Sequence, residues 1–251
     1  LGEQIDIHAG GEDLIFPHHE NEIAQSEAAN GKSFAKYWMH NGFLNIDNRK
    51  MSKSLGNFFT VREISEKYDL QVLRFFMLSA HYRSPLNFSA ELMEAAGNGL
   101  ERIVTAAANL KFLMGNAQVE KMTEEEASLF AQTDRFKENF EKAMDDDFNT
   151  ADAIAAIFDF VKFINTNASG NSSKEYLGKL HERLAELSNV LGIIVDKKEE
   201  MLDAEIEKMI EERQAARKNR DFARADQIRA DLLAKGIVLE DTREGVKWKR
   251  V

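Results

Sequence analysis

Lys50-Met51-Ser52-Lys53-Ser54, continuing into Leu55-Gly56-Asn57, is the most informative stretch of this chain. Its first five residues offer two ammonium groups and two hydroxyls beside a glycine, which suits a site for a triphosphate. When a carboxylate attacks the α-phosphorus of ATP, negative charge builds on the phosphate oxygens, and cations already in place stabilise it. Alone, a short Lys/Ser stretch is more often a solvated surface loop. The surrounding sequence is therefore needed to decide between a triphosphate site and a surface loop.

The composition sets the limits of the fold. The chain has 251 residues, 43% of them apolar, no cysteine and a net charge of −10. This length allows one large or two smaller domains, and no apolar run approaches the about 20 residues that span a bilayer. We expect a globular cytoplasmic protein without a membrane partner, disulfides or a cysteine-based metal site of its own. Because an apolar alternation at residues 4–8 predicts a buried strand directly at the start, we also expect a piece of a longer protein.

Residues 9–46 carry alternating turn, helix and strand signals. A glycine turn over residues 9–13 is followed by a helix from about residue 18 to residue 29. Pro17 suits the first position of this helix, where its missing N–H costs nothing. Residues 42–46 predict a short strand directly before the Lys50 segment.

Thr60 and Glu63 form a capping box, which predicts a helix over residues 61–79, interrupted near Asp69. Helical signals then fill most of residues 89–195. A first helix there has one apolar face, and Thr123 with Glu126 caps a second. Two more follow over 150–165 and 174–191, separated by a turn-rich stretch. Four antiparallel helices with short polar loops predict a bundle. The apolar face of the first helix comprises Leu92, Ala96, Leu100, Ile103, Ala107 and Leu110.

A small α+β unit is predicted after a boundary near residue 196. It should contain helices over 201–219 and 222–235, the second capped by Asp221, and then a hairpin. Residues 213–251 carry eleven basic and six acidic side chains on an otherwise acidic chain. Such a basic island is how a local nucleic-acid footprint appears.

His18 and Glu22 are four residues apart, so on a helix they share a face and can bind one metal ion. His19 and Glu22 are three apart and nearly meet the same condition. Spacing does not choose between the two histidines. Histidines at a helix start are also common as packing or hydrogen-bonding residues.

Taken together, these segments resemble the cysteinyl-tRNA synthetases, a family of class I aminoacyl-tRNA synthetases. Residues 50–54 match the ATP-binding loop of class I letter for letter, and residues 6–26, which include Phe16-Pro17-His18-His19-Glu20, read like the cysteine-specific members. The resemblance continues through residues 82–85, 146–150 and 236–241, and so covers essentially the whole chain.

The resemblance implies a fold that is mainly α with α/β parts. The end of a Rossmann-type catalytic domain is expected over residues 1–60 and a connection that contacts the tRNA stem over 61–88. A helical bundle against the anticodon stem would take residues 89–195, and a small anticodon-binding domain residues 196–251. The His-x-Gly-His motif and two zinc-binding cysteines of the family are absent from the sequence, which we expect truncation to explain.

The resemblance also implies the chemistry of the parent protein, a cysteine–tRNA ligase. L-Cysteine reacts with ATP, accompanied by Mg²⁺, to give cysteinyl adenylate and pyrophosphate, and the cysteinyl group then passes to cysteine tRNA. Zinc is expected on His18 and Glu22 together with the two missing cysteines, and we expect an inactive, monomeric fragment. Lys50 and Lys53 would be catalytic. The implied ATP-binding residues are Lys53, Lys50, Ser52, Ser54, His8, Gly10, Gly11 and Asp13.

For tRNA, the resemblance implies contacts within the basic C-terminal unit, namely Arg217, Phe222, Asp226, Asp241 and Trp248. Phe222 and Trp248 suit base stacking, although both also suit the core of a small domain. Two other functions stay open: a ligase that joins cysteine to an amino sugar in thiol biosynthesis, and a non-catalytic tRNA-binding module. The C-terminal unit argues against the first, and the intact Lys50 segment argues against the second.

Overall fold

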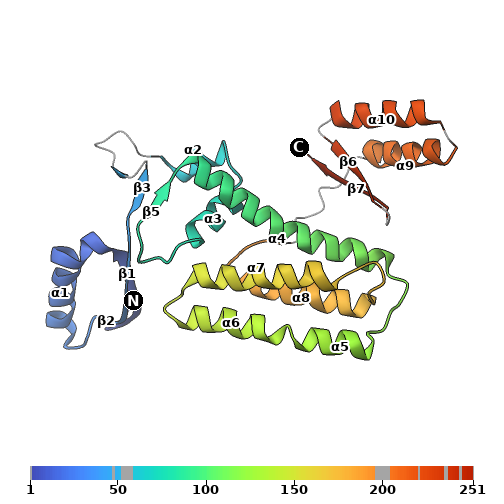
Figure 1. Cartoon of the computed structure of the whole chain (residues 1–251). Helices are drawn as coiled ribbons and strands as arrows, with labels where there is room; N and C mark the ends of the chain where they lie inside the picture. Colours follow the sequence, from blue (N-terminus) through green and yellow to red (C-terminus); the bar gives the residue numbers. More distant parts are fainter. Residues whose placement is uncertain are drawn as a thin grey trace.

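The computed structural model describes residues 2–46, 49–51, 59–195, 204–219, 221–234, 237–242 and 245–250. Figure 1 shows them in chain order as a small α/β part, a long helical bundle and a compact α+β unit. The predicted class, mainly α with α/β parts, is confirmed. No helix in these ranges is long and apolar enough to cross a membrane.

The α/β part begins with two parallel strands, β1 (Ile5–Gly11) and β2 (Ala35–Asn41). They are linked by two short helical turns, η1 (Glu12–Leu14) and η2 (Ile15–His19), and by helix α1 (Glu20–Asn30). The predicted strand is confirmed, but the prediction that it is buried is wrong. Ile7 is 55% exposed, because β2 is the one strand that pairs with β1 in the described part of the chain.

A second sheet places the chain around the Lys50 segment. β3 (Leu44–Ile46) lies between β4 (Arg49–Lys50), which is antiparallel to it, and β5 (Leu86–Phe88), which is parallel. Between β4 and β5 come α2 (Val61–Ser65) and α3 (Leu70–Leu78). The predicted capping box of Thr60 and Glu63 is present. The predicted interruption is confirmed too, since the carboxylate of Asp69 accepts a hydrogen bond from the Gln71 N–H and begins α3.

The bundle consists of α4 (Ala90–Asn116), α5 (Glu124–Ala131), α6 (Asp134–Asp145), α7 (Thr150–Asn167) and α8 (Lys174–Val190). Its predicted second helix is two helices, α5 and α6, which run along the same edge of the bundle (Figure 1). A continuous apolar core joins α3 to the bundle and includes Phe75, Ile103, Phe160 and Leu184. The α3 segment is therefore anchored on the helical part of the molecule.

The prediction assigned one residue wrongly to the apolar face of α4. Leu92 is 44% exposed, whereas Met93 is fully buried. The buried positions 93, 96, 100, 103, 107 and 110 alternate steps of three and four residues, the spacing that keeps one stripe of a helix against its neighbours. Leu92 lies one residue out of that phase.

The C-terminal unit has its own small core. Helices α9 (Ala204–Lys218) and α10 (Phe222–Ala234) precede the antiparallel hairpin of β6 (Ile237–Thr242) and β7 (Gly245–Arg250). Asp221 accepts a hydrogen bond from the Arg224 N–H, as the predicted cap requires. The core side chains are Ile228, Leu232, Ile237 and Leu239, with Met209 and Ile210 packed against them.

Candidate functional site

The N-terminal α/β part brings one strand histidine and one helix carboxylate together. His8 lies in the middle of β1, and Glu22 lies in the first turn of α1. Because α1 packs back over the strand that leads into it, His8 Nε2 and Glu22 Oε2 approach to 2.7 Å. The His8 ring also lies against Phe34 and Trp38, so aromatic side chains fix its position.

The two neighbouring histidines of η2 have different surroundings. His18 is largely exposed, and its Nε2 lies 3.4 Å from Glu22 Oε1. His19 is buried, and its Nδ1 lies 2.8 Å from Nε2 of His40 on β2. A Cβ on Gly10 would come within 2.8 Å of the His19 ring. A glycine is therefore required at position 10 for the His19 side chain to reach the interior.

These side chains form a potential metal site. The ligand atoms of His8, His19 and Glu22 all lie within 4.8 Å of one another. Imidazole nitrogen and carboxylate oxygen are common zinc ligands, and two ligands of a tetrahedral zinc ion lie about 3.3–3.5 Å apart. The 3.4 Å between His18 and Glu22 matches that separation without any movement. The cluster consists of His8, His19 and Glu22, so it contains Glu22 of the predicted pair, while His18 lies beside Glu22. The metal-binding role of His18 and Glu22 stays a prediction.

The surroundings of the buried His19 favour its neutral form. Burial lowers the pKa of His19, and the neighbouring His40 and His8 lower it further. A neutral imidazole is the form that binds a metal ion. The prediction missed His40 because its contact depends on the parallel pairing of β1 with β2, in which Gly10 lies opposite His40. The aromatic pair Tyr37-Trp38, of residue types that favour strands, carried the signal for that strand.

The predicted glycine turn is the end of β1. Gly10 and Gly11 close the strand, and Asp13 follows in η1. A Cβ on Gly11 would lie 2.6 Å from the carboxylate of Asp13, so this carboxylate folds back over the glycine. Gly10, Gly11 and Asp13 therefore lie together at the end of β1, two to five residues after His8. The assignment of these four residues to ATP stays a prediction.

The Lys50 segment lies only partly within the described residues. The backbone of Lys50 belongs to β4, and the Met51 N–H donates to the Leu44 carbonyl on β3. Ser52, Lys53 and Ser54 lie outside the described residues, as does the side chain of Lys50. Their roles in ATP binding and catalysis stay predictions.

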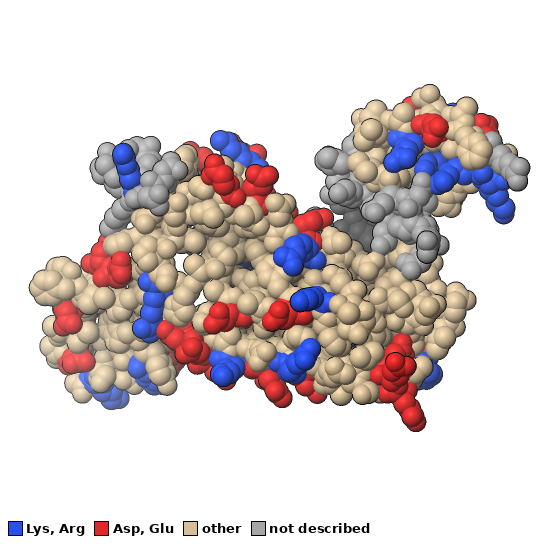
Figure 2. Space-filling view, viewed as in Figure 1, with Lys and Arg blue, Asp and Glu red and all other residues tan. Residues whose placement is uncertain are grey.

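The predicted tRNA-binding residues fall into two groups. Arg217, Phe222 and Asp226 are exposed on α9 and α10, and Phe222 is 61% exposed, so it is not a core residue. Figure 2 shows basic side chains on this unit together with a few acidic ones, and side chains of both signs along the bundle. Asp241 and Trp248 lie on β6 and β7, but their side chains lie outside the described part.

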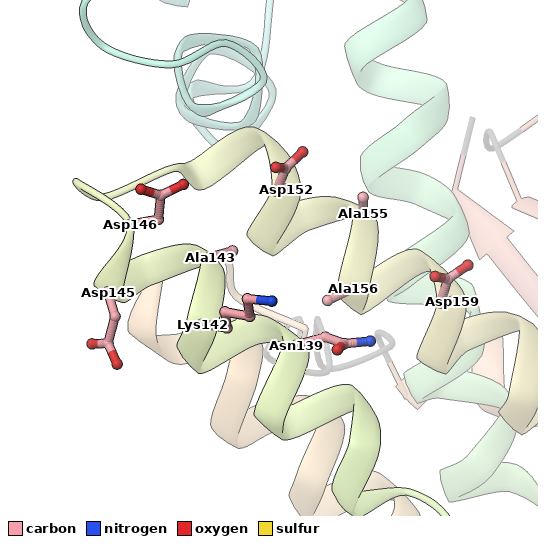
Figure 3. Close-up of a pocket in the computed structure, with 9 residues that line it drawn as sticks. All are labelled: Asn139, Lys142, Ala143, Asp145, Asp146, Asp152, Ala155, Ala156 and Asp159. Carbon is pink, nitrogen blue, oxygen red and sulfur yellow. The ribbon is translucent and has the colours of Figure 1, made fainter.

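A hollow of about 720 Å³ lies between α6 and α7 (Figure 3). Four carboxylates and Lys142 line it, the carboxylates being Asp145, Asp146, Asp152 and Asp159. A surface of this sign repels phosphate groups. The hollow is therefore unsuited to ATP or to an RNA backbone.

Three family models match the chain in succession. These are the catalytic domain of class I (C) tRNA synthetases over residues 1–98, the DALR domain over 139–195 and the cysteinyl-tRNA ligase anticodon binding domain over 199–248. The cysteine–tRNA ligase of Lachnospira eligens is 66% identical over the full chain, which covers 53% of that protein. That of Clostridioides difficile is 57% identical, again over the full chain and 54% of the relative. The chain thus spans about half the length of the curated relatives it matches.

Solved structures with the same fold come from two other synthetases. A LeuRS–tRNA–LeuAMS ternary complex from Agrobacterium radiobacter K84 superposes with a TM-score of 0.62 at 19% identity, over 73% of this chain and 25% of that one. Methionyl-tRNA synthetase of Mycobacterium tuberculosis with methionyl-adenylate gives 0.51 at 20% identity, over 75% and 40%. At these identities the likeness concerns the fold alone.

Proposed function

Because the chain belongs to the cysteine–tRNA ligase family of class I aminoacyl-tRNA synthetases, we propose that it supplies part of the machinery that joins L-cysteine to cysteine tRNA. In the first step the cysteine carboxylate attacks the α-phosphorus of ATP, and pyrophosphate leaves. In the second, a ribose hydroxyl at the tRNA 3′ end attacks the adenylate carbonyl, and AMP leaves. The observation that carries the proposal is the His18–Glu22 pair at 3.4 Å, within the segment that matches the catalytic-domain model.

The Lys50 segment has the electrostatic role in the first step. Lys50 and Lys53 offset the charge that develops on the phosphate oxygens, and the hydroxyls of Ser52 and Ser54 donate hydrogen bonds to the same oxygens. ATP enters with Mg²⁺. At the end of β1, the adenylate lies against the backbone of Gly10 and Gly11, near His8, and Asp13 accepts a hydrogen bond from the ribose or the ammonium group.

The donor set fits zinc in part. His18 and Glu22 have the separation that two ligands of one zinc ion require, while the 251-residue sequence contains no thiolate to complete the set. Zinc bound there would take the cysteine thiolate directly and so favour cysteine over serine, whose hydroxyl is a poorer ligand. His19 is hydrogen-bonded to His40 and supports the position of the neighbouring metal-binding side chains.

Two structural features support a tRNA substrate over an amino sugar. The unit formed by α9, α10 and the hairpin has its own core, and it presents the Phe222 side chain to solvent. An exposed aromatic side chain on a unit rich in basic residues suits stacking on an unpaired base. The division at residues 60, 88 and 195, the monomeric state and the cytoplasmic location stay predictions.

The test separates binding from catalysis. We expect the 251-residue chain to bind cysteine tRNA more tightly than a tRNA of equal length with another anticodon. We expect no cysteine-dependent exchange of pyrophosphate into ATP, because the sequence lacks the zinc thiolates and the His-x-Gly-His motif. Equal affinity for both tRNAs would refute the recognition role. Measurable exchange would show that the chain needs no further residues for activation.

A further inference from the structure

The turn between α6 and α7 reaches out of the bundle to the segment that follows α3. Tyr82 donates its hydroxyl hydrogen to Asp147 Oδ1 at 2.8 Å, and Arg83 Nε lies 2.7 Å from Asp147 Oδ2. His81 Nε2 lies 3.8 Å from the same oxygen. Asp147 thus meets three consecutive residues that are more than sixty positions away in the sequence.

The segment that Asp147 holds is itself fixed to the strands around the Lys50 segment. The Gly42 N–H donates to the Tyr82 carbonyl at 2.8 Å, and the Leu86 N–H donates to the Phe43 carbonyl at 2.9 Å. A Cβ on Gly42 would come within 2.6 Å of the Ser84 backbone. The connection between β2 and β3 therefore lies directly on residues 82–84, and β3 in turn accepts the Met51 N–H at its Leu44 carbonyl.

The backbone at Asp147 is unusual. Its φ angle is +56°, and that of the following Phe148 is +54°. Residues other than glycine seldom adopt this region, and a bulky residue there is a genuine outlier. Such outliers persist only where the surrounding structure holds them, and they cluster at functional positions. The strained turn points the Asp147 carboxylate toward residues 81–83.

A second contact also connects the bundle to the region at the end of α3. Thr150, the first residue of α7, donates its hydroxyl hydrogen to the Leu78 carbonyl at 2.8 Å. The end of α3 is thereby fixed to the bundle, and the chain leaves it in a set direction toward Tyr82. The hydrogen bond of Thr150 reaches a backbone carbonyl, whereas Asp147 contacts the side chains that follow the end of α3.

We propose that Asp147 is a positioning residue, which sets the connection between β2 and β3, and through β3 the start of the Lys50 segment, relative to the helical bundle. The role of the Lys50 segment in this inference rests on the proposed function. The link from Asp147 through Tyr82 to the Gly42 N–H, called the tie below, is structural. If the bundle moves when tRNA binds, the movement would be transmitted to the Lys50 segment through Asp147, residues 82–84 and β3.

The first experiment follows the tie in the 251-residue chain by hydrogen exchange at the Gly42 amide. Asp147→Gly is the main variant, since glycine adopts a positive φ freely and keeps the turn while it removes the carboxylate. Tyr82→Phe removes the other end of the contact, and Asp146→Asn is the control for charge in the same turn. We expect exchange at Gly42 to be about tenfold faster in Asp147→Gly and faster in Tyr82→Phe, with Asp146→Asn unchanged.

Two results would overturn the tie. Exchange at Gly42 equal to that of the parent chain in both variants would show that Asp147 serves only the turn. Faster exchange throughout α6 and α7 would assign it to the stability of the bundle instead. Neither readout needs catalytic activity, so this experiment stands even if the proposed function fails.

The second experiment uses the whole ligase that contains this chain. Asp147→Gly is expected to raise the KM for ATP in pyrophosphate exchange about threefold or more, with the KM for cysteine unchanged, because the His18–Glu22 pair lies outside the tie. Equal changes in both KM values would refute a positioning role. If the unsubstituted ligase shows no cysteine-dependent exchange, the proposed function is wrong, and the hydrogen-exchange result alone decides the tie.

Discussion

Glu126 and Ser173 join the first turns of two bundle helices that are 47 residues apart in the sequence. Glu126 Oε1 accepts from the Ser173 N–H at 2.8 Å, and Oε2 accepts from the Ser173 hydroxyl at 2.7 Å. Glu126 also completes the capping box of Thr123 at the start of α5, and Ser173 is the N-cap of α8. One carboxylate thus satisfies N-terminal donors of two helices, which is more than a capping box achieves alone.

Glu126→Gln should destabilise the chain in a pH-dependent way. Partial burial alone raises the pKa of Glu126, but the hydrogen bonds from Thr123 and Ser173 outweigh it, so its pKa lies below the ordinary 4.5. Its contribution is therefore present above about pH 4.5 and is lost as the pH falls through the folded-state pKa. Urea unfolding at pH 7 should show a loss of about 1–3 kcal/mol, and at acidic pH the difference should shrink. Glu125→Gln, at an exposed position of the same turn, is the control; a pH-independent difference would contradict the assignment.

Tyr176→Phe should leave the stability unchanged or raise it. The Tyr176 side chain is fully buried, and its hydroxyl has no hydrogen-bond partner among the described residues. Burial, with the nearby charge of Glu126, raises the pKa of Tyr176 to about 12. Removal of an unsatisfied buried hydroxyl without a change of shape is expected to gain up to about 1 kcal/mol in urea unfolding. A loss beyond that magnitude would mean that the hydroxyl does have a partner in solution.

His18→Ala should weaken zinc binding more than His19→Ala does. Removal of a supporting residue typically costs roughly 10–100-fold in metal affinity, and removal of a direct ligand is expected to cost at least as much. Glu22→Gln should behave like His18→Ala. Isothermal titration of the chain with Zn²⁺ gives the affinities, which we expect to be weak because no thiolate is present. A larger effect of His19→Ala would assign the site to His8, His19 and Glu22, whose ligand atoms all lie within 4.8 Å of one another.

Phe222→Ala should reduce the affinity for cysteine tRNA by about 1–3 kcal/mol, the value of one stacked base. Because Phe222 is exposed, the fold of α9 and α10 should be unaffected, as circular dichroism can check. Leu233→Ala removes an exposed apolar side chain from the same helix and is the matched control. An unchanged affinity in Phe222→Ala would remove this residue from the interface.

Arg217→Ala tests the electrostatic part of the same interface. Loss of one phosphate contact should weaken tRNA binding and reduce the slope of log K against log salt concentration by about 1. Lys137→Ala on the bundle, where the ammonium group pairs with Glu186, makes the same charge change elsewhere. A salt slope equal to that of the parent chain would exclude a phosphate contact at Arg217.

The local features of this fold were predictable from the sequence, whereas the contacts between distant segments were not. The capping boxes at Thr60 and Thr123 and the break at Asp69 depend on neighbours within a few residues, and they are present as expected. The contacts of His19 with His40 and of Asp147 with Tyr82 depend on how separate elements pack. No spacing rule connects residues that are 21 or 65 positions apart.

The candidate site shows the same division. The spacing of four residues between His18 and Glu22 predicted that they meet on one face of a helix. His18 lies in η2 and Glu22 in α1, and their side chains lie 3.4 Å apart. Spacing gave no reason to place His8 beside Glu22, because that contact needs α1 to fold back onto β1. The exposed Ile7 likewise depends on how many strands flank β1, which its own alternating pattern does not state.

The narrow β1–β2 pair has a practical consequence for work with this chain. Within the described residues it is a parallel sheet of two strands, with Ile7 and Tyr37 exposed opposite each other. Sheets of this width are marginal in water, and their outer edges offer free backbone groups to other molecules. We therefore expect self-association at high concentration to start at residues 5–11 and 35–41.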